Sequence, residues 1–369
     1  MVSKINTPHP YEDLPNEAFW RSAVADVSPF NIQDMYKPKF TIGKDTPIAA
    51  AGSCFAQHIA RNLKARGCNF LDMEQSPPGL SLDQQKNFGF NTYSGRFGNI
   101  YSVGQLFQMF QRASGAFKPV ETCWEHEGRF YDPFRPAIQP NGFASPEELA
   151  ADVASHLQCL NQLIRRTEVF IFTFGLTEGW INKEDGSILP TCPGTVVGNY
   201  DPDKYKFHNF THSELLNYAK RFIALASKRN PNMKFIFTVS PVPLTATASG
   251  NHVLPATIYS KSVLRGVCGE LSETYPQCDY FPSYEIISSH PFGGMFFEPN
   301  KRGVTKTGVE HAMGSFFSAH SEISNVQNNP VDGNGITAIM SKPQNSQWAQ
   351  NDDVVCEEEL LEAFGSKWF

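Results

Sequence analysis

The chain has 369 residues, of which 41% are hydrophobic and 18% charged, so it is long enough for one large folded domain or two. Its formal net charge is −6 at pH 7, and no excess of basic residues indicates a general nucleic-acid binder. The sequence has no apolar run of about 18 residues, the length of a membrane-spanning helix. Residues 1–20 lack the apolar core of a signal peptide. These features predict a cytoplasmic protein without a membrane span.

The eight cysteines are scattered along the chain. They form no CxxC pair, and no group of cysteines and histidines has the spacing of a zinc site. We therefore expect free thiols, no metal site and no organic cofactor.

Residues 1–39 are expected to form an irregular lead-in to the folded domain. Prolines at positions 8, 10, 15, 29 and 38 break regular structure there.

A strand, a tight turn and a helix are expected within residues 46–67. Residues 47–51 form a short apolar run, and one apolar helical face follows it at Phe55, Ile59 and Leu63. Ser53 lies between the two, where free backbone N–H groups and the positive end of the helix can stabilise an oxyanion. This position suits a catalytic serine, but the same hydroxyl could equally cap the helix.

Strands and helices continue to alternate along the chain. Further strands are predicted over 69–73, 168–174, 233–239 and 279–283. Capping boxes at 145–148 and 211–214 open helices that end near residues 166 and 229. Other helices are predicted up to residue 114, over 256–275 and over 305–320, with a hairpin over 122–131. Residues 74–98 and 182–210 are expected to be a long loop and a Pro/Gly-rich insertion.

Residues 321–369 are expected to be a flexible tail, because Asn, Gln, Ser, Pro and Gly dominate up to residue 353. A short acidic helix is predicted within it over 354–364. The folded domain would then span residues 40–320.

The alternation of strands and helices predicts an α/β fold with a largely parallel sheet. Ligands bind beyond the carboxyl ends of the strands in such sheets. Three polar segments follow predicted strands: Ser53, residues 175–178 and residues 240–243. Their common position strengthens the functional interpretation of Ser53.

Residues 52–56, Gly-Ser-Cys-Phe-Ala, resemble the signature of the GSCFA family, a branch of the SGNH/GDSL-type hydrolase-like proteins. Further blocks resemble the family in order, at 99–101, 132–136, 172–180, 238–244, 252–254, 259–265 and 280–286. The resemblance covers roughly residues 40–318. It implies a flavodoxin-like, three-layer sandwich around a mostly parallel sheet of about five strands.

The resemblance also implies roles for individual residues. Ser53 would be the nucleophile, and its own N–H and that of Gly98 would be oxyanion donors. The family block Gly-x-Asn-Asp is replaced here by residues 175–178, so the Thr177 hydroxyl would donate in place of an amide and Glu178 would hold a neighbouring group. The other candidate substrate-binding residues are Asn99, Gly175 and Cys54.

The chain departs from the family's pattern at the position of the general base. SGNH enzymes carry Asp-x-x-His before the last helix, and this chain has Asn300 and Gly303 near those positions. His252 is the preferred substitute and His290 the second candidate. Cys54 is a rival nucleophile at the helix amino terminus, or a small buried apolar residue.

The sequence therefore predicts an esterase that hydrolyses a small-molecule or glycan acyl ester. An O-acyltransferase and a non-catalytic binding protein on the same fold are the alternatives. Asp132 and Arg135 are expected to form a structural ion pair rather than part of the site.

Overall fold

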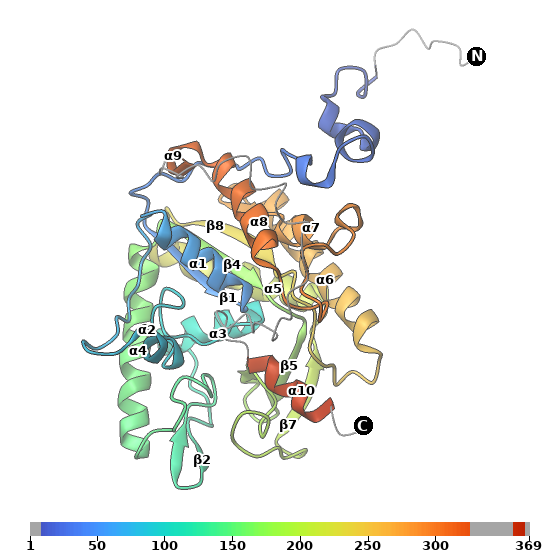
Figure 1. The fold of residues 1–369 in the computed structure, drawn as a ribbon. Coiled ribbons are helices and arrows are strands. Elements are labelled where there is room, and N and C mark those ends of the chain that lie inside the picture. The colour runs from blue at the N-terminus through green and yellow to red at the C-terminus, as the bar shows by residue number, and fades with distance from the viewer. Residues whose placement is uncertain (1–8, 325–356, 366–369) are drawn as a thin grey trace.

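A computed structural model describes residues 9–324 and 357–365, and it has a four-stranded parallel sheet between two layers of helices (Figure 1). The strand order is β1-β4-β8-β9. The strands are β1 (Ile48–Gly52), β4 (Val169–Phe174), β8 (Lys234–Val239) and β9 (Cys278–Tyr280). The α/β fold with a parallel sheet is thus confirmed.

The predicted strand at 69–73 forms only one bridge, between Phe70 and Ile48. The reason is that Ser94 takes the next position beside β1. Its Oγ accepts from Ala50 N–H at 2.9 Å, and its N–H donates to Ala50 O at 3.2 Å. The sheet consequently has four strands within the described residues, rather than about five.

Two apolar cores cover the two faces of the sheet. Ile48 and Ala50 face a core that includes α1 (Phe55–Ala65), α7 (Ser283–Ser288) and α8 (Lys306–Ala319). Ala49 and Ala51 face the other core, with α3 (Val103–Ala113), α4 (Pro146–Arg166), α5 (His212–Arg229) and α6 (Val253–Thr274). Because the sheet is buried on both faces, its strands are near-continuous apolar runs. The sheet and the two layers of helices form the predicted three-layer sandwich.

The predicted helix starts are confirmed at two helices. Ser145 Oγ accepts from Glu148 N–H at the start of α4, and Thr211 forms a full capping box with Glu214 at α5. Each cap binds an otherwise unpaired N–H group of the first turn.

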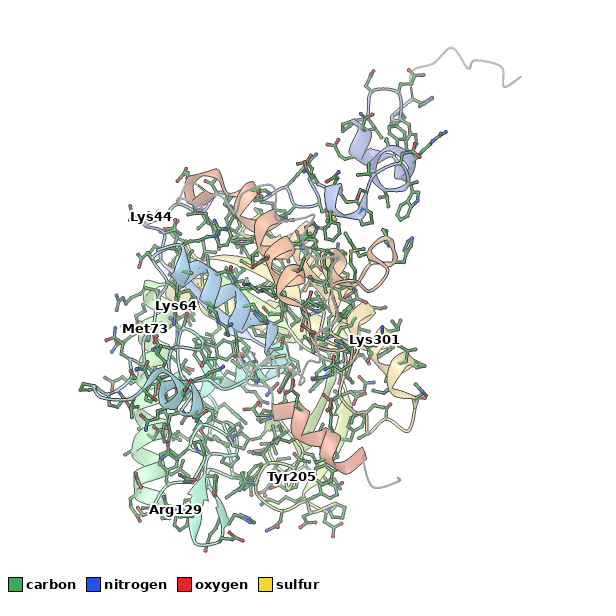
Figure 2. All side chains as sticks on the ribbon, viewed as in Figure 1. Lys44, Lys64, Met73, Arg129, Tyr205 and Lys301 are labelled. Atoms are coloured by element: carbon green, nitrogen blue, oxygen red, sulfur yellow. The ribbon has the colours of Figure 1, made fainter. Side chains whose placement is uncertain are left out.

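Two small antiparallel sheets lie below the main sheet in Figure 1. The predicted hairpin is present as β2 (Trp124–His126) and β3 (Arg129–Tyr131), with positive φ angles at Glu127 and Gly128 in its turn. Arg129 marks this hairpin in Figure 2. The second sheet has the order β6-β5-β7, from Ile188–Leu189, Glu178–Asn182 and Tyr205–Asn209. β6 and β7 lie within residues 182–210, which the sequence predicted as a Pro/Gly-rich insertion.

The chain ends extend the predicted domain. Short helices occur at Asn16–Ala18 (η1), Arg21–Ala25 (η2) and Pro29–Asn31 (η3), and the Ile32 and Tyr36 side chains are buried in the core beside α8. Ile323, in α9 (Ser321–Ser324), is buried there too. Of the tail predicted over residues 321–369, residues 325–356 and 366–369 lie outside the described residues.

The remaining elements are α2 (Leu82–Asn87), η4 (His290–Phe292), η5 (Glu357–Leu361) and α10 (Glu362–Gly365). The last two match the short helix predicted near the carboxyl terminus. In the part of the chain that is described, no helix combines the length and the apolar character needed to span a membrane.

Candidate functional site

Ser53 follows β1 directly and precedes α1. Its side chain is only 2% exposed, and its Oγ forms no hydrogen bond with any of the described residues. Helix α1 begins at Cys54 as N-cap and has no side-chain cap, so Ser53 does not serve as a helix cap. Buried hydroxyls without a partner are uncommon in native structures, so this one calls for an explanation.

The backbone N–H of Ser53 donates to Thr173 O at 3.1 Å and extends the pairing of β1 with β4. The sequence comparison implied that this N–H would be an oxyanion donor. In the structure it is already used by the sheet.

Ser53 lines a small cavity of about 10 Å³ at the carboxyl ends of the strands. A space of this size holds about one water molecule. The cavity is lined by Ser53, Cys54, Tyr101, Gly175, Leu176, Ser240, Val242, Pro243, Leu244 and Lys261. Three predicted site residues, Ser53, Cys54 and Gly175, are thus brought together, along with residues from the third predicted polar segment.

Gly175 lies directly against the serine. A Cβ atom at this position would lie 2.9 Å from Ser53 Cβ and 3.1 Å from Tyr101 Cδ1. Gly175 N–H also donates to Tyr101 O at 2.9 Å. Only glycine therefore fits between the serine and the tyrosine without a shift of one of them.

Lys261 is a pocket residue that sequence reasoning missed. Its side chain is 2% exposed, and its Nζ donates to Gly175 O at 2.5 Å. The position was visible in the sequence, because Lys261 shares a helical face of α6 with Leu264 and Cys268, both buried. A lysine on such a face is rarely fully buried without a specific partner.

The Asn99 side-chain amide lies near the backbone of Ser53, to which Tyr93 connects it. Tyr93 OH donates to Asn99 Oδ1 at 2.5 Å and lies 3.3 Å from Ser53 O. Asn99 Nδ2 donates to Glu357 Oε2 at 3.0 Å, and Tyr101 OH lies 3.4 Å from the same oxygen. These contacts hold a carboxylate from the chain's carboxyl-terminal segment beside the candidate site.

Gly98 precedes Asn99 and also lies beside Glu357, and it has a φ angle of +66°. A Cβ atom on Gly98 would lie 3.4 Å from Glu357 Oε1. Glu357 itself is only 6% exposed. The sequence placed it in a polar tail and gave no reason to expect it in a buried position.

Thr177 and Glu178 do not line the Ser53 pocket. The Thr177 hydroxyl donates to Asn209 Oδ1 at 2.6 Å, because the chain turns there into β5, which pairs with β7. Glu178 Oε1 accepts from the Thr247 hydroxyl at 2.5 Å, and burial raises the pKa of Glu178. Both residues therefore lie at the start of the second sheet, where their side chains bind neighbouring residues.

The two histidines proposed as base also lie outside this pocket. His252 is exposed and caps α6, with Nδ1 accepting from Leu254 N–H at 3.1 Å. His290 stacks on Trp20 with ring centroids 5.4 Å apart. Neither imidazole lines the cavity that holds the Ser53 hydroxyl.

Asp132 and Arg135 form the predicted structural ion pair. Arg135 Nε donates to Asp132 Oδ2 at 2.7 Å, and Arg135 Nη2 donates to Asp152 Oδ2 at 2.7 Å. Burial would raise the pKa of Asp132, but the Arg135 guanidinium outweighs burial and lowers it. Next to this pair, His156 Nδ1 lies 2.7 Å from Glu74 Oε2. Burial opposes ionisation of Glu74 as well, yet the hydrogen bond and charge of His156 hold its pKa at about 2.

A groove of about 810 Å³ lies at the other end of the sheet. Pro47, Glu168 and Lys234 line it, at the amino ends of β1, β4 and β8. Its size does not make it the functional site, because ligands of parallel sheets bind at the carboxyl ends.

The sequence profile of the GSCFA family matches residues 47–316. The chain belongs to the GSCFA family. The matched region begins one residue before β1 and ends inside α8, so it contains all four parallel strands and the Ser53 pocket. No curated protein matches the chain.

Three solved structures are similar to this GSCFA protein at low identity. A carbohydrate esterase family 3 protein from Talaromyces cellulolyticus is 9% identical, with 76% of this chain and 100% of that chain covered and a TM-score of 0.36. An acetyl esterase mutant with acetate ion is 8% identical, with the same coverage and a TM-score of 0.34. A Clostridium thermocellum family 3 carbohydrate esterase is 9% identical, covering 74% and 94%, with a TM-score of 0.32. TM-scores this low support no conclusion about this chain.

Proposed function

We propose that this GSCFA protein is a serine esterase in which Ser53 Oγ attacks the carbonyl carbon of an acyl ester. The observation that supports the proposal best is the Ser53 hydroxyl itself. It is buried, has no hydrogen-bond partner among the described residues and faces a cavity at the carboxyl edge of the sheet. Enzymes of this kind form an acyl-serine intermediate, which water then hydrolyses.

Gly98 N–H and the Asn99 side-chain amide are the proposed oxyanion donors. In the described structure Asn99 Nδ2 already binds an anionic oxygen, that of Glu357. Donors that bind a carboxylate oxygen are also suited to a developing oxyanion. The proposal therefore includes displacement of the Glu357 carboxylate from Asn99 when substrate binds.

A short acyl group is the proposed substrate feature, because the cavity beside Ser53 has a volume of only about 10 Å³. The alcohol portion, a glycan hydroxyl in the favoured case, would extend out of this cavity. Transfer of the acyl group to a sugar hydroxyl instead of water uses the same serine, and the same acyl-serine intermediate.

Intact-mass labelling with a fluorophosphonate probe tests the proposal. The native chain should gain one phosphonyl adduct, Ser53→Ala should gain none, and Cys54→Ala should react like the native chain. Failure of the folded native chain to react would contradict the esterase mechanism. Loss of the reaction in Cys54→Ala, with Ser53→Ala still reactive, would move the chemistry to the thiol.

A non-catalytic binding protein is the second candidate. Two observations favour it: no histidine lines the Ser53 pocket, and the Ser53 N–H is used by the sheet. Under this alternative the native chain stays unlabelled although folded, and short-chain acyl esters bind without turnover. Isothermal titration with an acetylated oligosaccharide would then measure binding, and mass spectrometry would find the acetyl group intact.

A further inference from the structure

The attack by Ser53, on which this inference rests, requires a group that takes the hydroxyl proton. Histidine is the commonest such base. All ten histidines of the chain lie between residues 9 and 320, inside the described part. None of them lines the Ser53 pocket. The pocket therefore points to a base of another kind.

Most of the histidines are engaged in other contacts. Carboxylates lie beside four of them: His9, His156, His208 and His212. Aromatic rings pack against four others: His58, His290, His311 and His320. Bringing any of these to Ser53 would break the contact that it makes in the structure.

Lys261 is the basic side chain in the described lining of the pocket. It extends from the buried face of α6, and its Nζ donates to Gly175 O at 2.5 Å. The same glycine contacts the serine, since a Cβ atom on Gly175 would lie 2.9 Å from Ser53 Cβ. Lys261 and Ser53 thus both contact Gly175 and line one cavity.

We propose that Lys261 is the general base that activates Ser53. In the neutral amine one N–H is held by Gly175 O, which orients the nitrogen, and its lone pair takes the Ser53 proton across the cavity that both residues line, which has room for one water molecule to relay it. As that proton moves to Nζ, Ser53 Oγ bonds to the acyl carbon. The ammonium group then returns the proton to the leaving alcohol oxygen as the ester C–O bond breaks. Water, deprotonated by the same amine, releases the carboxylic acid and restores the serine.

Other ionisable groups near Lys261 affect how the reaction of Ser53 depends on pH. The Cys54 thiol and the Tyr101 phenol line the same cavity, and Glu357 lies 3.4 Å behind the Tyr101 oxygen. Farther along α6, the charged groups that face its neighbours are paired with one another: Glu270 with Lys220 of α5 at 3.1 Å, and Arg265 with Glu285 of α7 at 2.5 Å.

The test is the rate of fluorophosphonate labelling of the full chain, followed by intact mass between pH 6 and pH 10. For the native chain the rate should rise with pH to a plateau, because only the neutral amine takes a proton. Lys261→Met should lower the rate by about 10²- to 10⁴-fold, the usual contribution of a general base. Lys261→Arg should lose as much, because arginine keeps the charge and the N–H donor but cannot accept a proton. Lys306→Met, at an exposed position of α8, is the matched control and should react like the native chain.

Circular dichroism and urea denaturation establish that each variant is folded. If Lys261→Met does not fold, Lys261→Arg and the native pH profile decide the question. Native-like labelling in Lys261→Arg would show that the charge or the hydrogen bond to Gly175 matters rather than proton transfer, and would overturn the inference. Loss of labelling in His252→Ala, with Lys261→Met still reactive, would overturn it in favour of the imidazole. In both cases the native chain is still labelled at Ser53, so these failures differ from a failure of the proposed esterase, in which the folded native chain is never labelled.

Discussion

Gly52→Ala tests the close contact that positions Ser53. Gly52 ends β1 with a φ angle of +141°, a conformation that residues with a Cβ atom rarely adopt. A Cβ atom there would lie 2.4 Å from Thr173 O and 2.7 Å from Thr173 N. Both atoms belong to the backbone of β4, so no side-chain rotation can relieve the overlap.

The expected loss of stability has two parts. Holding an alanine at this φ angle costs about 1–3 kcal/mol, and forcing extra volume into a packed core costs about 1–3 kcal/mol more. We expect a total loss of about 2–6 kcal/mol, a large fraction of the ~5–15 kcal/mol by which domains are usually stable. The hydrogen bond from Ser53 N–H to Thr173 O is next to the overlap and should weaken with it.

Urea denaturation followed by far-UV circular dichroism measures this loss. With a slope of about 3 kcal/mol per molar, a loss of 3 kcal/mol lowers the midpoint by about 1 M. Gly314→Ala in α8 is the matched control, since a Cβ atom there meets no heavy atom within 4 Å. It should be neutral or stabilise the protein by up to about 1 kcal/mol. A Gly52→Ala midpoint equal to that of the native chain would refute the close approach of β1 and β4 at this residue.

Three further predictions concern buried charges. Because the pKa of Glu74 is lowered from 4.5 to about 2, ionised Glu74 should add about 3 kcal/mol to the free energy of unfolding above pH 4.5, and this stabilisation should be lost as the pH falls toward 2. Urea midpoints measured at pH 7, 4 and 3 should therefore fall less steeply with pH in Glu74→Gln than in the native chain. The same pH dependence in both proteins would contradict this prediction. Arg135→Met leaves the buried Asp132 carboxylate without its main partner and should cost about 3–5 kcal/mol; the double change with Asp132→Asn should recover part of the loss, and a single variant with native stability would exclude a critical ion pair. Glu357→Ala removes the buried carboxylate of the carboxyl-terminal segment, so hydrogen exchange should accelerate over residues 357–365 and the Ser53 labelling rate should rise; unchanged exchange there would mean that Glu357 does not hold this segment.

Much of the fold was predictable because its signals are local. Apolar runs identified the strands that became β1, β4, β8 and β9, and capping boxes identified the starts of α4 and α5. The strand–turn–helix around Ser53 spans few residues, so periodicity alone placed its hydroxyl at the carboxyl edge of the sheet. The strands of the β5–β7 sheet were missed because each has at most five residues and they lie beside or within a Pro/Gly-rich segment, although residues 205–208 alternate apolar and polar.

The surroundings of Ser53 were decided by tertiary structure. Lys261 and Glu357 are far from Ser53 in the sequence. The packing of α6 brings Lys261 into the pocket, and the position of residues 357–365 brings Glu357 against Asn99 and Tyr101. His252, predicted as the base, instead caps the helix that carries Lys261. Ser94 similarly pairs with Ala50, so the predicted strand at 69–73 contacts β1 through one bridge rather than along its length. The sequence by itself determined the strands, the helices and the place of the serine, because these depend on the spacing of neighbouring residues. Its partners depend on which distant surfaces bury one another, and only the folded chain determines that.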